Sequence, residues 1–130
     1  MTTLNNIEHL VLKIKNTTLN LNFYNDFFTL LGYTQDQKLE NYLNYSNGIL
    51  PIGLYFEQNF KVNNSNTAGL GHIAWKTNDK ELFEKLNKLI IQYDLKYETL
   101  GEIRKHHNQD FNTISFYCPS GNRLELISES

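Results

Sequence analysis

Two histidines and one glutamate in this sequence could together bind a divalent metal ion. His9 falls within an apolar segment at residues 7–14, His72 within residues 70–75, and Glu125 within residues 123–127. Imidazole nitrogens and a carboxylate oxygen suit Fe(II), Mn, Ni or Zn, and three such groups leave positions free for water or substrate. Taken singly, each residue has a plainer interpretation, because a histidine on a strand usually serves structure and a glutamate near a chain end is usually solvated.

The elements that must position these residues form the same series twice. A predicted strand at residues 7–14 precedes a predicted helix that begins after Asn16 and ends at Gly32, a residue suited to a helix terminus. Three shorter strands follow at residues 33–40, 42–46 and 51–58. The second half repeats this order, with a strand at 70–75, a helix after Asn78, and strands at 95–103, 111–118 and 123–127.

The two helices predict which face of each sheet is covered. The first carries an apolar stripe, and the second carries another at the same helical spacing. His9 and His72 occupy matching places in the two halves, and both lie away from the helix-packing face, as does Glu125. Two such sheets curled together would form a cup lined by these three residues. The stripes comprise Leu19, Phe23, Phe27, Leu30 and Leu31 in the first helix, and Leu82, Leu86, Leu89 and Ile90 in the second.

The bulk composition excludes several classes of protein. The chain has 130 residues, of which 40% are hydrophobic and 20% charged, which is enough for one folded domain with a real core. The net charge of −2 and the lack of a basic run argue against nucleic-acid binding. We recognise no membrane span and no signal peptide, and the single cysteine, Cys118, cannot form an internal disulfide. We therefore expect a soluble cytoplasmic protein.

Four segments, in this order, resemble the vicinal-oxygen-chelate superfamily, which includes glyoxalases, bleomycin-resistance proteins, fosfomycin-modifying enzymes and extradiol dioxygenases. The resemblance covers nearly the whole chain. It implies an α+β fold of two βαβββ modules, at about residues 1–60 and 68–130, which form a cupped mixed sheet with helices outside. The segments are Ile7-Glu8-His9-Leu10-Val11-Leu12, Phe23-Tyr24 with Leu30-Leu31-Gly32-Tyr33, Gly71-His72-Ile73-Ala74-Trp75, and Pro119-Ser120-Gly121-Asn122-Arg123-Leu124-Glu125-Leu126.

The resemblance also implies a ligand set. Metal-using members take one ligand from the first strand of each module and a glutamate from the last strand, and the matching positions here are His9, His72 and Glu125. A fourth ligand often comes from the last strand of the first module. Setting residues 54–56 against residues 124–126 places Tyr55 there, with Glu57 two residues further on the same predicted face. The chain thus departs from the four-ligand lyase pattern, or reaches it through a shifted Glu57.

The first function that this resemblance implies is a divalent-metal-dependent lyase or isomerase acting on a small oxygen-rich substrate. Glu125 or Glu57 would move the proton, and Tyr55 and His107 would contact the substrate. Two alternatives stay open: an Fe(II) ring-cleaving dioxygenase, and a metal-free protein that binds an antibiotic or metabolite. Members of this superfamily often pair modules across chains, so we also expect a homodimer.

Overall fold

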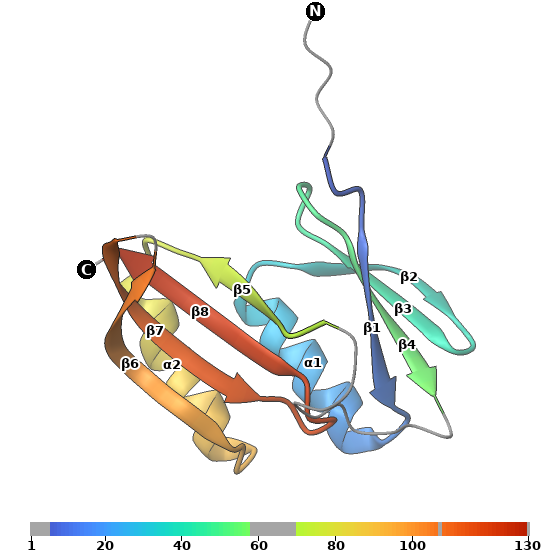
Figure 1. The fold of residues 1–130 in the computed structure, drawn as a ribbon. Coiled ribbons are helices and arrows are strands. Elements are labelled where there is room, and N and C mark those ends of the chain that lie inside the picture. Colours follow the sequence, from blue (N-terminus) through green and yellow to red (C-terminus); the bar gives the residue numbers. More distant parts are fainter. Residues whose placement is uncertain (1–5, 58–69, 107, 130) are drawn as a thin grey trace, which may run out of the picture. The chain divides into compact units, whose positions relative to one another are not determined.

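The structure of the chain is a computed structural model that describes residues 6–57, 70–106 and 108–129. The chain divides into two compact units, Met1–Phe60 and Lys61–Ser130, which we call unit 1 and unit 2. Each unit contains one helix and one four-stranded mixed sheet (Figure 1). The predicted α+β fold with two βαβββ modules is therefore confirmed.

Unit 1 forms a sheet in the order β1-β4-β3-β2. β1 runs parallel to β4, while β3 is antiparallel to both β4 and β2. A parallel neighbour requires a long crossover connection, which here includes the helix and the β2–β3 hairpin. The elements are β1 (Leu10–Lys15), α1 (Thr18–Leu30), β2 (Thr34–Leu39), β3 (Tyr42–Ser46) and β4 (Ile52–Glu57).

Unit 2 repeats this topology, with the sheet order β5-β8-β7-β6. The first and last strands of the unit, β5 and β8, are again parallel, and the remaining pairs are antiparallel. The internal repeat inferred from the sequence thus extends to strand order and strand direction. The elements are β5 (His72–Lys76), α2 (Lys80–Gln92), β6 (Tyr97–His106), β7 (Gln109–Tyr117) and β8 (Arg123–Glu129).

Both helix starts lie one residue later than the sequence predicted. The side chain of Thr17, not Asn16, caps α1 by accepting a hydrogen bond from the backbone N–H of Asn20 at 3.2 Å. Asp79, not Asn78, caps α2 by accepting from the backbone N–H of Glu81 at 3.0 Å. Threonine and aspartate can cap as well as asparagine, so adjacent candidates leave the choice to the backbone path.

The apolar stripe of α1 is rotated from the predicted one. Leu19 is 52% exposed, whereas Phe28 is fully buried and packs its ring 5.3 Å from Tyr33 and 4.8 Å from Tyr45 on β3. Large aromatic rings bury more surface than leucine, so they set which side of the helix meets the sheet. The buried residues of α1 are Asn20, Phe23, Tyr24, Phe27 and Phe28.

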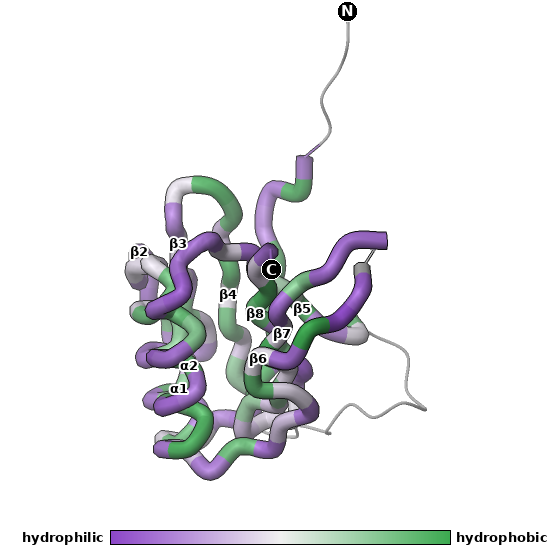
Figure 2. Tube along the Cα trace, turned by 90° about the vertical axis from the view of Figure 1, so that its left-hand side faces the viewer, coloured by the Kyte–Doolittle hydropathy of each residue, from purple (hydrophilic) through white to green (hydrophobic). Residues whose placement is uncertain are grey.

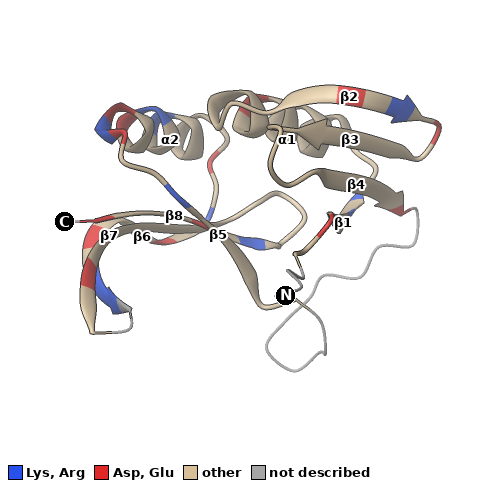
Figure 3. Ribbon diagram, turned by 90° about the horizontal axis from the view of Figure 1, so that it is seen from above, with Lys and Arg blue, Asp and Glu red and all other residues tan. Residues whose placement is uncertain are grey.

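The second helix buries the predicted side. Its buried residues are Leu86, Leu89 and Ile90, and Leu82 is half-buried. Hydropathy along the chain shows β4 as a largely hydrophobic strand (Figure 2). β2, at the edge of unit 1, carries charged residues while its neighbour β3 carries none (Figure 3). No helix within the described ranges is both long enough and apolar enough to cross a membrane.

Candidate functional site

The parallel pairing of β5 with β8 brings His72 and Glu125 together within unit 2. His72 pairs with Arg123 and Ala74 pairs with Glu125, so the two side chains stand on the same face of neighbouring strands. The Nε2 atom of His72 lies 3.1 Å from the Oε2 atom of Glu125. The leucines on either side of Glu125, Leu124 and Leu126, are buried and point to the opposite face of the sheet.

The two members of this pair differ in depth. The Glu125 side chain is 3% exposed and the His72 side chain is 42% exposed. A carboxylate removed from water needs compensating partners, and Glu125 has a second one in Arg123, whose guanidinium lies 3.5 Å from its Oε1 atom. One carboxylate oxygen therefore faces Arg123 and the other faces His72.

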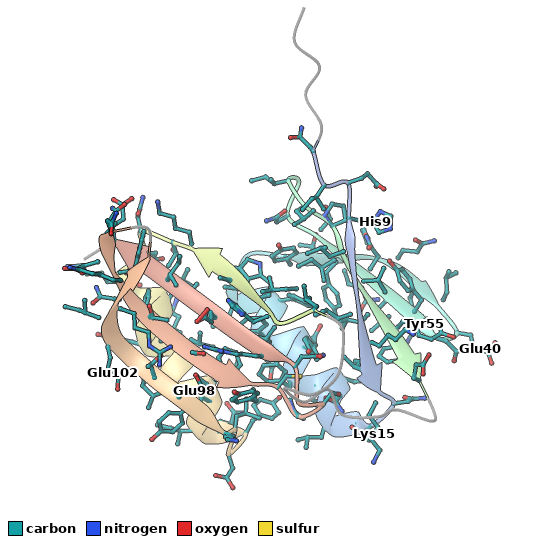
Figure 4. The ribbon with its side chains drawn as sticks, in the orientation of Figure 1. His9, Lys15, Glu40, Tyr55, Glu98 and Glu102 are labelled. Atoms are coloured by element: carbon teal, nitrogen blue, oxygen red, sulfur yellow. The ribbon has the colours of Figure 1, made fainter. Side chains whose placement is uncertain are left out.

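Arg123 connects Glu125 to a second carboxylate, Glu98 on β6. Its guanidinium lies 3.2 Å from Glu98 Oε2, and its Nε atom donates a hydrogen bond to the hydroxyl of Ser115 at 3.0 Å. The Tyr117 hydroxyl donates to the other Glu98 oxygen at 2.7 Å. Glu98 and Glu102 both lie on β6 (Figure 4). Sequence reasoning missed this network, although the spacing of Arg123 and Glu125 placed both on one face.

The hydrogen bond between Tyr117 and Glu98 changes the acidity of both groups. It stabilises the ionised carboxylate, and together with the nearby Arg123 and Arg104 guanidinium groups it holds the pKa of Glu98 below its usual value of 4.5. The same bond raises the pKa of Tyr117 above 10.0, because loss of its proton would place two negative charges side by side. At neutral pH the network thus contains an ionised glutamate and a neutral tyrosine.

His72 and Glu125 have the chemistry and spacing of two ligands of one metal ion. A divalent ion binds imidazole nitrogen and carboxylate oxygen at about 2.1 Å, so two neighbouring ligand atoms around it lie about 3.0–3.4 Å apart. The observed 3.1 Å fits that range. Among the described residues, no group of three or more His, Cys, Asp or Glu side chains gathers as a metal-binding cluster.

The other predicted site residues within the described part of unit 1 lie on or beside β1 and β4. His9 immediately precedes β1, is exposed, and contacts the carboxylate of Glu8 through its Nδ1 atom (Figure 4). Tyr55 on β4 is 39% exposed. Glu57 ends β4 and forms an ion pair with Lys13 at 3.6 Å. His107 lies outside the described residues.

The strand register corrects the position that was matched to Glu125. Gly53 pairs with Val11, two residues after His9, as Glu125 pairs with Ala74, two residues after His72. Gly53, not Tyr55, therefore occupies the place in unit 1 that is equivalent to that of Glu125. Pairwise comparison of the apolar residues could not reveal this, because both alignments keep the same alternation of faces.

A pocket of about 330 Å³ lies between α1 and the sheet of unit 1, on the helix-covered side. Leu43, Tyr45 and Phe56 contribute to its lining from the sheet, and Asn22 and Asn25 from the helix. Burial raises the pKa of Tyr45 above 10.0. This pocket contains none of the predicted site residues.

Comparisons with known proteins identify the fold. No protein-family model and no curated protein sequence matches the chain significantly. Solved structures do match across nearly its whole length. A fosfomycin resistance protein, FosX, from Listeria monocytogenes has a TM-score of 0.70 at 16% identity and covers 98% of this chain and 96% of its own.

Two other structures give similar values. Lactoylglutathione lyase from Agrobacterium tumefaciens has a TM-score of 0.65 at 16% identity, covering 98% of this chain and 96% of its own. A glyoxalase/bleomycin resistance protein/dioxygenase from Alicyclobacillus acidocaldarius has a TM-score of 0.64 at 18% identity, covering 99% and 95%. The chain has the fold of the vicinal-oxygen-chelate superfamily, to which these proteins belong.

Proposed function

We propose that this chain is a divalent-metal-dependent lyase or isomerase of the lactoylglutathione-lyase kind, acting on a small oxygen-rich substrate. The observation that carries this proposal is the 3.1 Å separation of His72 Nε2 and Glu125 Oε2 on one face of unit 2. These atoms are ligands of the kind that hold a divalent ion. The fold shared with lactoylglutathione lyase supports the reaction class.

The proposed metal ligands are His72 and Glu125, with His9 as the residue at the matching position of unit 1. Zn, Ni, Mn and Fe(II) are the candidate ions. Such an ion, when bound, polarises oxygen atoms of a substrate and so acidifies a neighbouring C–H group. Glu125 or Glu57 would take up the proton, and Tyr55 and His107 would contact the substrate.

Metal binding is tested first, by isothermal titration of protein purified without chelators or an affinity tag. We expect about one ion per chain and a large loss of affinity in His72→Ala, because removal of one ligand leaves the ion poorly held. Lys76→Ala is the matched control, since Lys76 lies on the same strand and face but pairs with Glu129 at 2.8 Å. Equal affinities in the two variants would show that His72 is not a ligand.

The reaction class is tested by offering three compounds to the metal-loaded protein. Turnover of a hemithioacetal that stops on addition of chelator supports the lyase. Oxygen uptake with a catechol would instead assign Fe(II) dioxygenase chemistry to the same ligands. Tight binding of bleomycin that is indifferent to chelator would remove both enzymatic functions and leave a binding protein.

We further propose that the protein forms a homodimer. The edge strand β2 has six residues, all exposed. Unpaired strand edges are usually covered or guarded by charge, and β2 carries Asp36 and Lys38. Light scattering at micromolar concentration gives the mass directly, and a value near the 15.2 kDa of one chain would exclude the dimer.

A further inference from the structure

The position equivalent to Glu125 has no side chain in unit 1, because it is Gly53. The glycine is not there to allow an unusual backbone. The described glycines with positive φ are Gly32, Gly48, Gly101 and Gly121, and Gly53 is not among them. Gly53 must therefore serve the space above β4.

That space is filled by the side chain of Tyr42 on the neighbouring strand β3. A Cβ atom built on Gly53 would lie 1.9 Å from the Tyr42 hydroxyl oxygen and 2.4 Å from its Cζ atom. No side chain larger than hydrogen fits at position 53 while the phenol stays in place. The Tyr42 hydroxyl thus sits where a side chain at the Glu125-equivalent position would begin.

Unit 2 uses the opposite arrangement at the same two places. Tyr42 pairs with Tyr55, two residues beyond Gly53, just as Thr113 pairs with Ile127, two residues beyond Glu125. Tyr42 is therefore equivalent to Thr113. Unit 2 combines a large acidic residue on its last strand with a small one on the neighbouring strand, and unit 1 combines no side chain with a large phenol. Each unit ends with one oxygen-bearing group over the same position.

Neighbouring hydrogen bonds fix the direction of the Tyr42 proton. An ionised carboxylate only accepts hydrogen bonds, so Asp36 must face the amide nitrogen of Asn44, which lies 2.6 Å away. The amide oxygen of Asn44 then faces Tyr42, whose hydroxyl donates to it at 3.3 Å. With its proton directed at Asn44, the phenol oxygen presents its lone pairs as a hydrogen-bond acceptor.

We propose that the Tyr42 oxygen accepts a hydrogen bond from a hydroxyl group of the ligand, and so selects substrates that carry a hydroxyl beside their chelating oxygens. This inference rests on the metal-dependent function proposed above. It gives unit 1 an uncharged acceptor in the place where unit 2 has a carboxylate. Because a neutral phenol brings no negative charge, Tyr42 contributes to ligand selection and not to holding the metal.

The test uses two small chelators that differ only in the hydroxyl. Glycolate carries a hydroxyl that can donate, and methoxyacetate has a methyl group in its place. Binding of each to the Ni-loaded protein is measured by calorimetry. Tyr42→Phe should weaken glycolate about three- to tenfold, the usual effect of losing one hydrogen bond, and leave methoxyacetate within about twofold.

Two further variants separate Tyr42 from its surroundings. Tyr55→Phe removes the hydroxyl of the directly paired tyrosine and should bind both chelators like the wild type. Gly53→Ala places a methyl group against the phenol and should reproduce the Tyr42→Phe result without removing any hydroxyl. Circular dichroism and urea unfolding of all three variants show that each is folded.

The outcomes distinguish this inference from the proposed function. If the wild-type protein binds no metal, the proposed function fails and this inference fails with it. If metal binds but Tyr42→Phe keeps the wild-type preference for glycolate, only the role of Tyr42 is overturned. If Tyr42→Phe loses Ni as strongly as His72→Ala, Tyr42 is a ligand and the acceptor role is likewise overturned.

Discussion

His72 and Glu125 form a pair in which the histidine is accessible and the glutamate is not. Their ring nitrogen and carboxylate oxygen lie 3.1 Å apart, with 42% of one side chain and 3% of the other exposed. The buried carboxylate is held from behind by Arg123 at 3.5 Å, so its remaining oxygen has a defined direction. Such support of a ligand from outside the metal shell is common in metal sites and orients the ligand before the ion binds.

Glu125→Gln tests whether this carboxylate holds the metal. We expect affinity for Zn or Ni to fall by more than about 100-fold, because even residues that only support a ligand typically change affinity by about 10–100-fold. Glu129→Gln is the control, since Glu129 lies on the same strand but is exposed and pairs with Lys76. Titration calorimetry measures both, and a loss shared equally by the two variants would point to net charge and away from coordination.

Glu57→Gln tests the proposed base. The substitution keeps the shape of the side chain and removes its basicity, so turnover of a hemithioacetal should fall by about 10²–10⁴ while metal affinity is retained. The ion pair with Lys13 at 3.6 Å is lost as well. Lys13→Met removes that ion pair from the other side and serves as the control. If both variants lose activity equally, the ion pair matters and the base does not.

The hydrogen bond from Tyr117 to Glu98 makes stability depend on pH in the acid range. The folded pKa of Glu98 is lowered from 4.5, so its contribution is present above pH 4.5 and is lost as the pH falls through the folded pKa. Tyr117→Phe removes the largest cause of the lowered pKa. The variant should be less stable than the wild type at neutral pH, and the difference should shrink at low pH.

Urea unfolding at several pH values measures this difference, and NMR titration of the side-chain carboxyl carbon measures the pKa itself. The pKa of Glu98 should rise toward 4.5 in Tyr117→Phe. Glu129 is the internal control, because its pKa is lowered chiefly by its hydrogen bond to Lys76 and should not change. A Glu98 pKa unaffected by loss of the Tyr117 hydroxyl would contradict the assignment.

Phe28→Ala tests the packing of α1 on the sheet of unit 1. Phe28 is fully buried and its ring lies 4.8 Å from that of Tyr45, so truncation leaves a cavity at the helix–sheet contact. We expect the free energy of unfolding to fall by about 3–5 kcal/mol. Leu19→Ala on the same helix should change it far less, because Leu19 is 52% exposed. Both values come from urea denaturation, and equal losses would mean that the predicted stripe through Leu19 is the packed one.

Local chemistry in the sequence was sufficient for the fold. Alternating apolar residues marked the strands, and the second helix buried Leu86, Leu89 and Ile90 as its spacing predicted. The repeated order of elements predicted two βαβββ units, and both have the predicted topology. These features depend on short-range periodicity, which each segment carries by itself.

Features that depend on competition between similar neighbours required the tertiary structure. Thr17 and Asp79 cap the helices although Asn16 and Asn78 could have done so, and Phe28 displaced Leu19 from the packed side of α1. In each case the alternatives have similar intrinsic preferences, and the path of the backbone or the burial of larger rings decides between them.

The candidate site shows the same division. The sequence placed His72 and Glu125 on the face away from the helix, because side-chain direction alternates along a strand. Only the pairing of β5 with β8 brought the two within 3.1 Å, and only the pairing of β1 with β4 made Gly53 the counterpart of Glu125. Strand register joins residues about 40–50 positions apart in the chain, and a shift of two residues leaves the alternation of faces unchanged. Periodicity in the sequence therefore determines which face a residue occupies, and the hydrogen-bonded register determines which residue it meets there.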